Sequence, residues 1–287
     1  MTRITGVINT WQEAGNIRTA IAGLRGWCDE IVVVDQHSPD GTAAIAEAEG
    51  ARVVLCEQTG FVEAARKIGI DAAEGDWVLA LDADEIVHPE LGRELRRIAE
   101  AGEADVVRIP RKNIILGRWM RYGQWWPNAK PRFFRKESLI VGDRIHAGLV
   151  PAPGARVIEL AAREELALWH YSYHSLEDLV EKTNRYTSVE ARQAGDKRRK
   201  RARPWVMVRE TAKNLWEEYL SQGGWRDGTA GLAVAVTRAY YRFLSLAKTW
   251  DEPSAATRLA DYEASKRRLL GLPPADTTAP TAPTEDA

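Results

Sequence analysis

Short apolar runs alternate with amphipathic segments through the first 110 residues of the chain. Five runs rich in branched or apolar residues predict buried strands, at residues 4–8, 31–34, 52–55, 77–81 and 106–109. Between them, apolar residues recur at spacings of three and four, as they do from Ile17 to Leu24, and this spacing predicts helices. Strands that alternate with helices at short spacing predict a mostly parallel sheet covered by helices, which is an α/β fold.

The pattern changes after residue 110. Residues 111–172 consist of short, aromatic-rich pieces that resemble strands, whereas the chain from 175 to about 270 is helical in pattern. The final residues are rich in Pro, Thr and Ala and carry no core residues, so they are expected to be disordered. The predicted parts are an α/β domain over residues 1–172, a helical region over 173–270 and a disordered tail over 271–287.

Acidic residues follow the predicted strands, where parallel sheets bind their ligands. The sharpest group is LDADE at 81–85, because Asp82 and Asp84 lie two residues apart where a buried strand ends. Two such carboxylates can turn toward one point, and hard oxygen ligands together with a diphosphate suit Mg²⁺ or Mn²⁺. The alternative interpretation is a polar turn that ends the strand.

Two further positions have the chemistry of a nucleotide site. Asp35 ends the strand at 31–34, and its carboxylate can accept a hydrogen bond from a base or a ribose. Arg66 lies on the helix before LDADE and can hold a diphosphate through two parallel hydrogen bonds. Asp40 is instead expected to be the N-cap of the helix that follows it.

Composition limits the functional classes. The 287 residues carry a formal net charge of -1, so the chain as a whole is no polyanion binder, and nothing resembles a nucleic-acid-binding motif. Cys28 and Cys56 have no metal-ligand spacing, which favours a reduced, cytoplasmic location. No apolar run suits a signal peptide or approaches the roughly 18 residues of a membrane span.

The order of five blocks identifies a known family. INTWQEAGNI, IVVVDQHSPDGT, ARK, GDWVLALDADE and the later GQWWPNAKPRFFRK resemble the inverting family 2 glycosyltransferases of the GT-A fold. The resemblance is strongest to the branch that adds sugars to lipopolysaccharide cores and other envelope glycans, and it spans about residues 3–252. It implies a GT-A, Rossmann-like sheet, a nucleotide-sugar donor such as a UDP-hexose, and a divalent Mn²⁺ or Mg²⁺ ion.

The same resemblance assigns roles to individual residues. It implies that Asp35 binds the nucleoside, that Arg66 contacts nucleotide or phosphate, and that Asp82 and Asp84 engage the metal-bound diphosphate. Further donor-binding positions are Asn9, Thr10, Glu13, Trp125 and Arg132. His170 is a candidate metal or phosphate partner.

Two departures affect the general base that an inverting transferase needs to deprotonate its acceptor. Members of the family usually have an acid where this chain has Asn128, and His-Glu where it has His146-Ala147. Asp143 and His146 remain nearby, and Asp143 ranks first as the base. The alternative is that Asp143 is a turn residue beside Gly142.

The acceptor stays open. The cluster Trp119, Tyr122, Trp125 and Trp126 is either a platform on which a sugar ring stacks or a packed corner of the core. A glycan, a lipid-linked sugar and a peptide side chain are all candidate acceptors, and a scaffold that binds the nucleotide without catalysis is a further alternative. A sugar-1-phosphate nucleotidyltransferase is disfavoured, because INTWQEAGNI has no Gly-rich phosphate loop.

The run DKRRKRAR at 196–203 holds six basic residues against one acid, beside amphipathic helices. One interpretation is docking on the anionic inner face of the cell membrane. The other is a solvated loop between helices that pack on the domain or on another subunit of a homo-oligomer.

Overall fold

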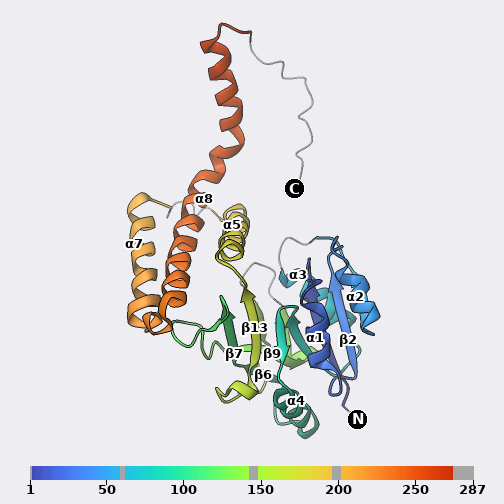
Figure 1. Cartoon of the computed structure of the whole chain (residues 1–287). Helices are drawn as coiled ribbons and strands as arrows, with labels where there is room; N and C mark the ends of the chain where they lie inside the picture. Colours follow the sequence, from blue (N-terminus) through green and yellow to red (C-terminus); the bar gives the residue numbers. More distant parts are fainter. Residues whose placement is uncertain (1, 59–61, 142–147, 196–201, 274–287) are drawn as a thin grey trace.

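The computed structural model describes residues 2–58, 62–141, 148–195 and 202–273, and it consists of a sheet region joined to a group of helices (Figure 1). The predicted class is confirmed: the protein is an α/β fold with a mostly parallel large sheet and a helical C-terminal part. The predicted boundary at residue 172 falls within the last strand, β13 (Leu168–Tyr173), and remains a prediction. Most of the predicted tail, residues 274–287, lies outside the described residues.

The large sheet has seven strands in the order β12-β6-β9-β4-β1-β2-β3. Their bounds are β1 Ile4–Thr10, β2 Glu30–Asp35, β3 Arg52–Leu55, β4 Trp77–Asp82, β6 Val106–Ile109, β9 Lys130–Arg135 and β12 Val157–Glu159. All five predicted strands are present. Strand β9 runs antiparallel to its neighbours β4 and β6, whereas the β1, β2, β3 and β4 pairings are parallel.

A second sheet of four strands lies beside the first, in the order β5-β13-β7-β8. Its other strands are β5 Glu85–Val87, β7 Arg111–Ile115 and β8 Arg118–Trp119, and a separate hairpin pairs β10 Leu139–Val141 with β11 Leu149–Pro151. The sequence did not predict β5, because three residues that include an acid give no recognisable period.

Helices cover both faces of the large sheet. They are α1 Ile17–Leu24, α2 Thr42–Ala48, α3 Val62–Ala72 and α4 Pro89–Ala101. Alternate residues of each strand face opposite sides. Ile4 and Ile8 of β1 therefore pack in the cluster that contains α1 and α4 side chains, while Val7 packs in the cluster that contains α3 side chains. All seven residues of β1 are buried, as expected for a strand in the middle of the sheet.

Helix α3 approaches the sheet closely at Gly69. A Cβ atom there would lie 2.4 Å from Val7 Cγ1 and 2.8 Å from Val34 Cγ2, which is closer than carbon atoms can pack. Only glycine allows this separation, and it brings Arg66, one turn earlier in the helix, toward the end of β4.

One local prediction needs correction. The N-cap of α2 is Gly41, which has a φ of 85°, and Asp40 precedes it. The Asp40 carboxylate still accepts hydrogen bonds from the backbone N–H and the hydroxyl of Thr42, and its other oxygen accepts one from the Ala14 N–H. The left-handed turn therefore needs a glycine at the cap, while the aspartate one residue earlier joins the loops after β1 and β2.

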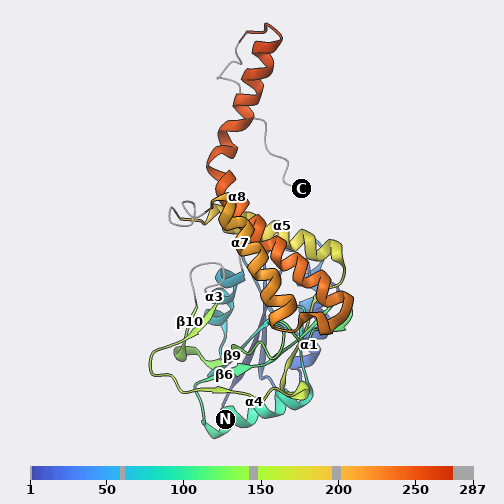
Figure 2. The ribbon, with the colours of Figure 1, turned by 90° about the vertical axis from the view of Figure 1, so that its left-hand side faces the viewer.

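The C-terminal part is built on one long helix. Helix α8 (Gly228–Leu269) packs between α5 (Leu176–Arg192) and α7 (Pro204–Leu215), as Figure 1 shows. The segments η3 (Trp216–Ser221), a π-helical turn, and η4 (Gly224–Asp227) join α7 to α8. The last part of α8 projects from the body of the molecule (Figures 1 and 2). Among the described residues, no helix has both the length and the apolar character needed to cross a bilayer.

Candidate active site

Three polar residues meet at the carboxyl edge of the large sheet. Strand β1 lies between β2 and β4, and its register places Asn9 opposite both Val34 and Asp82, and Thr10 opposite Asp35. Asp35 and Asp82, which the sequence places at the ends of predicted strands, therefore lie at neighbouring strand ends with Asn9 between them. This edge is where a parallel sheet binds its ligand.

Asp82 is held by two arginines. Its Oδ1 accepts from Arg66 Nη2 at 2.5 Å, and its Oδ2 accepts from Arg132 Nη2 at 2.7 Å. Burial raises the pKa of this carboxyl, but the guanidinium groups of Arg132 and Arg66 outweigh that effect and hold the pKa well below its ordinary value. Asp82 is therefore ionised, and both of its oxygens are engaged by cations of the protein.

Glu85 completes this buried charge cluster from strand β5. The side chain is fully buried, accepts from Arg132 Nη2 at 3.0 Å and lies 3.5 Å from Arg111 Nη1. Its second oxygen accepts from the Asp82 backbone N–H at 3.0 Å. Arg132, which is 5% exposed, thus contacts Asp82 and Glu85 inside the protein, and its predicted direct contact with the nucleotide remains a prediction.

Asp84 lies in the turn between β4 and β5, next to a histidine. Its Oδ2 is 3.4 Å from Nε2 of His170, which belongs to β13. Nδ1 of His170 is 2.7 Å from Oδ1 of Asn113, a fully buried residue of β7. The Asn113 Nδ2 donates to the Trp125 and Arg111 carbonyls, so the amide orientation is fixed and Oδ1 accepts the histidine proton. Nδ1 of His170 therefore donates to Asn113, and its Nε2 faces Asp84.

This pair fits a divalent cation. A carboxylate oxygen and an imidazole nitrogen are ordinary ligands of Mn²⁺, and adjacent ligands of an octahedral ion with 2.0–2.1 Å bonds lie about 3 Å apart. A hydrogen bond from an amide to the other ring nitrogen is the usual way in which proteins orient a metal-binding histidine. Within the described ranges, no group of three or more His, Cys, Asp or Glu side chains could hold a metal ion.

Asp35 is fully buried at the end of β2. Its Oδ2 accepts from the Thr10 hydroxyl at 2.9 Å, and its Oδ1 accepts from the Ser38 backbone N–H at 2.8 Å. Each carboxylate oxygen can accept more than one hydrogen bond. Thr10 and Ser38 thus orient Asp35, whose contact with a nucleoside remains a prediction.

Asn9 is a buried amide with unused hydrogen-bonding capacity. It is 6% exposed, and neither its Nδ2 nor its Oδ1 has a hydrogen-bond partner among the described residues. A buried amide normally finds partners, so one without them at a strand end indicates a ligand contact. Nearby Glu13 accepts from Asn16 Nδ2 at 2.7 Å. Burial raises the Glu13 pKa, and the charges of Asp84 and Asp82 raise it further, which places Glu13 at the same site.

One member of the aromatic cluster, Trp125, is packed inside the protein, whereas Trp119, Tyr122 and Trp126 are half-buried. Trp125 is 9% exposed and packs with Ile115, Met120 and Val234, and Arg238 lies over its ring at 5.2 Å. Trp119 and Trp126 meet edge to face, with 5.2 Å between ring centroids. The packed-corner interpretation therefore describes Trp125, although its backbone carbonyl holds Asn113 and so contributes to the site.

Two predicted residues cannot be placed. Asp143 and His146 lie outside the described residues. Asn128, which stands where the family usually has an acid, has a φ of 43° and donates from Nδ2 to the Gln124 carbonyl at 2.6 Å, so its amide supports its own loop.

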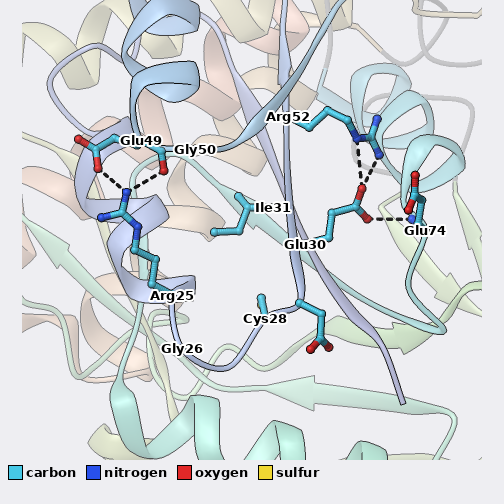
Figure 3. A pocket seen from close by; sticks show the side chains of 10 residues that line it. Arg25, Gly26, Cys28, Glu30, Ile31, Glu49, Gly50, Arg52 and Glu74 are labelled. Atoms are coloured by element: carbon cyan, nitrogen blue, oxygen red, sulfur yellow. Dashed lines mark hydrogen bonds and ion pairs between the residues drawn. The ribbon is translucent and has the colours of Figure 1, made fainter. Parts of the chain in front are cut away.

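A hollow seen in Figure 3 lies elsewhere. It is lined by residues at the amino ends of β2 and β3, the edge opposite Asp35, and its charged groups are paired with one another. Arg52 binds Glu30, and Arg25 binds Glu49. It offers no group comparable to the free Asn9 amide.

Sequence reasoning missed Asn113. The available signal was an amide directly before the apolar run of residues 114–116, because a polar side chain in a buried strand needs a defined partner. Glu85 was noted only as part of LDADE, and the sequence could not show that it turns inward to Arg132.

Comparison with known proteins shows which family the sequence resembles. The model of the family "Glycosyl transferase family 2" matches residues 6–149. A Rickettsia felis protein named uncharacterized glycosyltransferase is 29% identical over 261 residues, which is 86% of this chain and 89% of that protein. The lipopolysaccharide core biosynthesis glycosyltransferase LpsC of Rhizobium meliloti is 26% identical over 80% of this chain and 86% of LpsC.

Solved structures resemble the chain over a shorter span. Glucosyl-3-phosphoglycerate synthase from Mycobacterium tuberculosis, in complex with Mn²⁺, UDP and glucosyl-3-phosphoglycerate, is 27% identical with a TM-score of 0.34. That match covers 39% of this chain and 44% of the synthase. The family match covers half of the chain and includes Asn9, Asp35, Asp82 and Asp84, and the chain is therefore a glycosyltransferase that belongs to glycosyl transferase family 2.

Proposed function

We propose that this glycosyltransferase moves a hexose from a UDP-sugar, with inversion at the anomeric carbon, to an envelope-glycan or lipid-linked acceptor. The observation that carries the proposal is the Asp84–His170 pair beside the ion-paired Asp82. The similarity to LpsC, which is named for lipopolysaccharide core biosynthesis, supports the acceptor class.

Asp84 and His170 would hold a divalent ion, which when bound neutralises charge on the departing diphosphate. Asn113 keeps the His170 proton on Nδ1 and so leaves Nε2 available. Asp82 holds Arg66 at the rim of the site, where the buried Nε–H of Arg66 has no partner among the described residues. The sequence also predicts Asp82 as a direct metal ligand. In that role, one of the two arginines that bind its oxygens would have to release it.

Donor binding would use the strand ends. The free Asn9 amide and the Asp35 carboxylate, oriented by Thr10, would contact the nucleoside, and Arg66 would contact phosphate. An inverting transfer also needs a proton acceptor within about 3 Å of the attacking group. Asp143 is proposed for that role, with His146 next to it in the same segment.

Metal-dependent nucleotide binding tests the proposal. Calorimetry should show that UDP binds more tightly with Mn²⁺ than without it, and that Asp84→Asn removes the difference. The matched control is Asp71→Asn, because Asp71 is an exposed acid paired with Lys67 on the outside of α3. Equal metal dependence in wild type and Asp84→Asn would refute the metal site.

A transfer assay separates the acceptor classes and the non-catalytic alternative. Asp143→Asn should lower turnover about 10²-fold or more while UDP binding is unchanged, which is the usual scale of general-base catalysis. Transfer to a cysteine-bearing or serine-bearing peptide in place of a glycan would favour the peptide alternative. UDP binding without transfer to any acceptor would favour the scaffold.

A further inference from the structure

Helix α7 and the π-helical turn η3 present an apolar stripe to solvent. Trp205, Val208, Trp216 and Leu220 are 58%, 67%, 62% and 47% exposed, and Ala212 between them is also exposed. The spacings are three, four, four and four residues, so the five side chains lie on one face of the helix. We call this set the α7 stripe.

The α7 stripe faces away from the rest of the protein. The opposite side of α7 carries Val206 and Met207, which pack with Leu246 of α8 in a small core. In Figure 1 α7 lies at the left edge with α8 between it and α5, and in Figure 2 that edge faces the viewer. Folding therefore buries the face of α7 that packs on α8 and leaves the α7 stripe exposed to solvent.

Exposed tryptophans in a row have a thermodynamic cost. Apolar surface that stays in contact with water loses the stabilisation that burial would give it. Scattered apolar side chains on a surface need no explanation, but a contiguous stripe with two tryptophans marks a site of interaction. The question is which surface covers it.

Cations border the α7 stripe. Arg209 and Lys213 lie next to it on the same helix with 54% and 60% of their side chains exposed. Arg209 pairs with Glu210 and sits over the Trp205 ring at 5.0 Å, and Lys213 lies 3.6 Å from Glu217. Arg203, also exposed, precedes the first residue of the helix. It ends the sequence run 196–203 with its six basic residues, of which 196–201 lie outside the described residues.

From this arrangement we propose that the α7 stripe docks on the surface of a lipid bilayer that contains anionic lipids. Tryptophans with bordering Arg and Lys are the side chains that proteins place at the boundary between head groups and acyl chains. Anionic head groups complement the basic run of the sequence that precedes α7. A bilayer also accepts a straight, convex helix without a matching groove, which a protein partner would have to supply.

Vesicle co-sedimentation of the full chain tests the docking without any sugar donor, so its outcome is independent of the proposed chemistry. Wild type should bind phosphatidylcholine vesicles that contain phosphatidylglycerol, and binding should weaken as salt rises. The double variant Trp205→Ser/Trp216→Ser should bind about tenfold or more weakly, because two interfacial anchors are lost. The matched control is Trp250→Ser, which removes an equally exposed tryptophan (62%) from α8 and should bind like wild type.

Tryptophan quenching by brominated lipids gives a second measurement. Quenching should be present in wild type and largely absent in the double variant, while the melting temperatures of both stay equal because the replaced side chains are exposed. Absence of wild-type binding, or equal loss in the Trp250→Ser control, would overturn the proposal. It would also be overturned if the double variant kept full vesicle binding but dissociated a dimer of the chain in sedimentation velocity, because the α7 stripe would then be an interface between copies.

Discussion

The sheet region and the helical region place their unusual side chains in opposite environments. In the sheet region, charged groups are inside: Glu85, Arg132 and most of Asp82 are buried and satisfy one another at the strand ends. In the helical region, apolar groups are outside, with Trp205 and Trp216 more than half exposed. A buried charge requires a fixed geometry around it, whereas a contiguous stripe of exposed apolar side chains indicates a partner. The first region is thus built to hold a small ligand precisely, and the second to meet a surface.

The largest expected effect breaks the buried charge cluster. Arg132→Ala leaves Glu85 and one oxygen of Asp82 without their main cation, and removing one partner of a buried pair costs about 3–5 kcal/mol of unfolding free energy. Urea denaturation measures this loss. The control is Arg163→Ala, which removes an exposed arginine paired with Glu165 and should leave stability unchanged.

The ion pair between Asp82 and Arg132 also predicts how the stability of the fold depends on pH. Because the native pKa of Asp82 lies below its ordinary value of about 3.9, the pair stabilises the fold fully above that value. This stabilisation disappears as the pH falls through the lowered native pKa. The stability difference between wild type and Arg132→Ala should therefore be constant near neutral pH and shrink in strong acid. A difference that grew as the pH fell below 4 would contradict the ion-pair assignment.

A second prediction concerns the orientation of His170. Asn113→Ala should weaken Mn²⁺ binding in the presence of UDP about 10- to 100-fold, since a partner that orients a ligand histidine contributes on that scale. Calorimetry of Mn²⁺ binding measures the change.

The informative comparison variant is Asn113→Asp. A carboxylate keeps the acceptor for the His170 Nδ1 proton but loses both donors of the amide, so it should retain most of the metal affinity even if the fold is destabilised. Equal losses of metal affinity in the two variants would assign Asn113 a purely structural role.

A smaller effect is expected at Asn9. Because its amide has no partner in the protein, Asn9→Ala should change the unfolding free energy little, yet it should weaken UDP binding by about 1 kcal/mol, the net value of one hydrogen bond. That corresponds to roughly a fivefold change in Kd. A variant that unfolds more easily but binds UDP normally would place Asn9 among the structural residues.

The smallest effect is expected in the projecting part of α8. Truncation after Glu252 removes residues such as Leu259 and Tyr262, which are 77% and 57% exposed, and should leave the melting temperature of the remainder unchanged. A clear drop in melting temperature would show that this segment is covered in solution, for example by a second copy of the chain.

The two regions also differ in how far the sequence predicts them. Short apolar runs rich in branched residues, such as 31–34 and 77–81, are typical of buried strands, so the strands along the chain and the polar residues at their ends follow from the pattern. The partners of those polar residues do not follow, because they come from distant segments: Arg132 is 50 residues from Asp82, and Asn113 is 57 residues from His170. Periodicity reports burial along one element and carries no information about contacts between elements.

The helical region shows a different limit. Apolar periodicity predicts helices over 175–270, but Val206 and Val208 are equally apolar, and only the position of α8 decides that the first is buried and the second exposed. The aromatic cluster is similar, since the sequence allowed either a sugar platform or a packed corner for Trp125. The position of Val234 and Arg238 on α8, more than 100 residues later, decides it.

The absence of a side chain at Gly69 has a consequence for how this enzyme can evolve. Because α3 rests directly on Val7 and Val34, an enlargement at any of these three positions would lift the helix and draw Arg66 away from Asp82. The ion pair between Arg66 and Asp82 therefore limits which substitutions the sheet beneath the site can accept, although the substituted residues do not contact that pair. New donor or acceptor preferences are more accessible through the loops after the strands, where a change of residue leaves the spacing between helix and sheet intact.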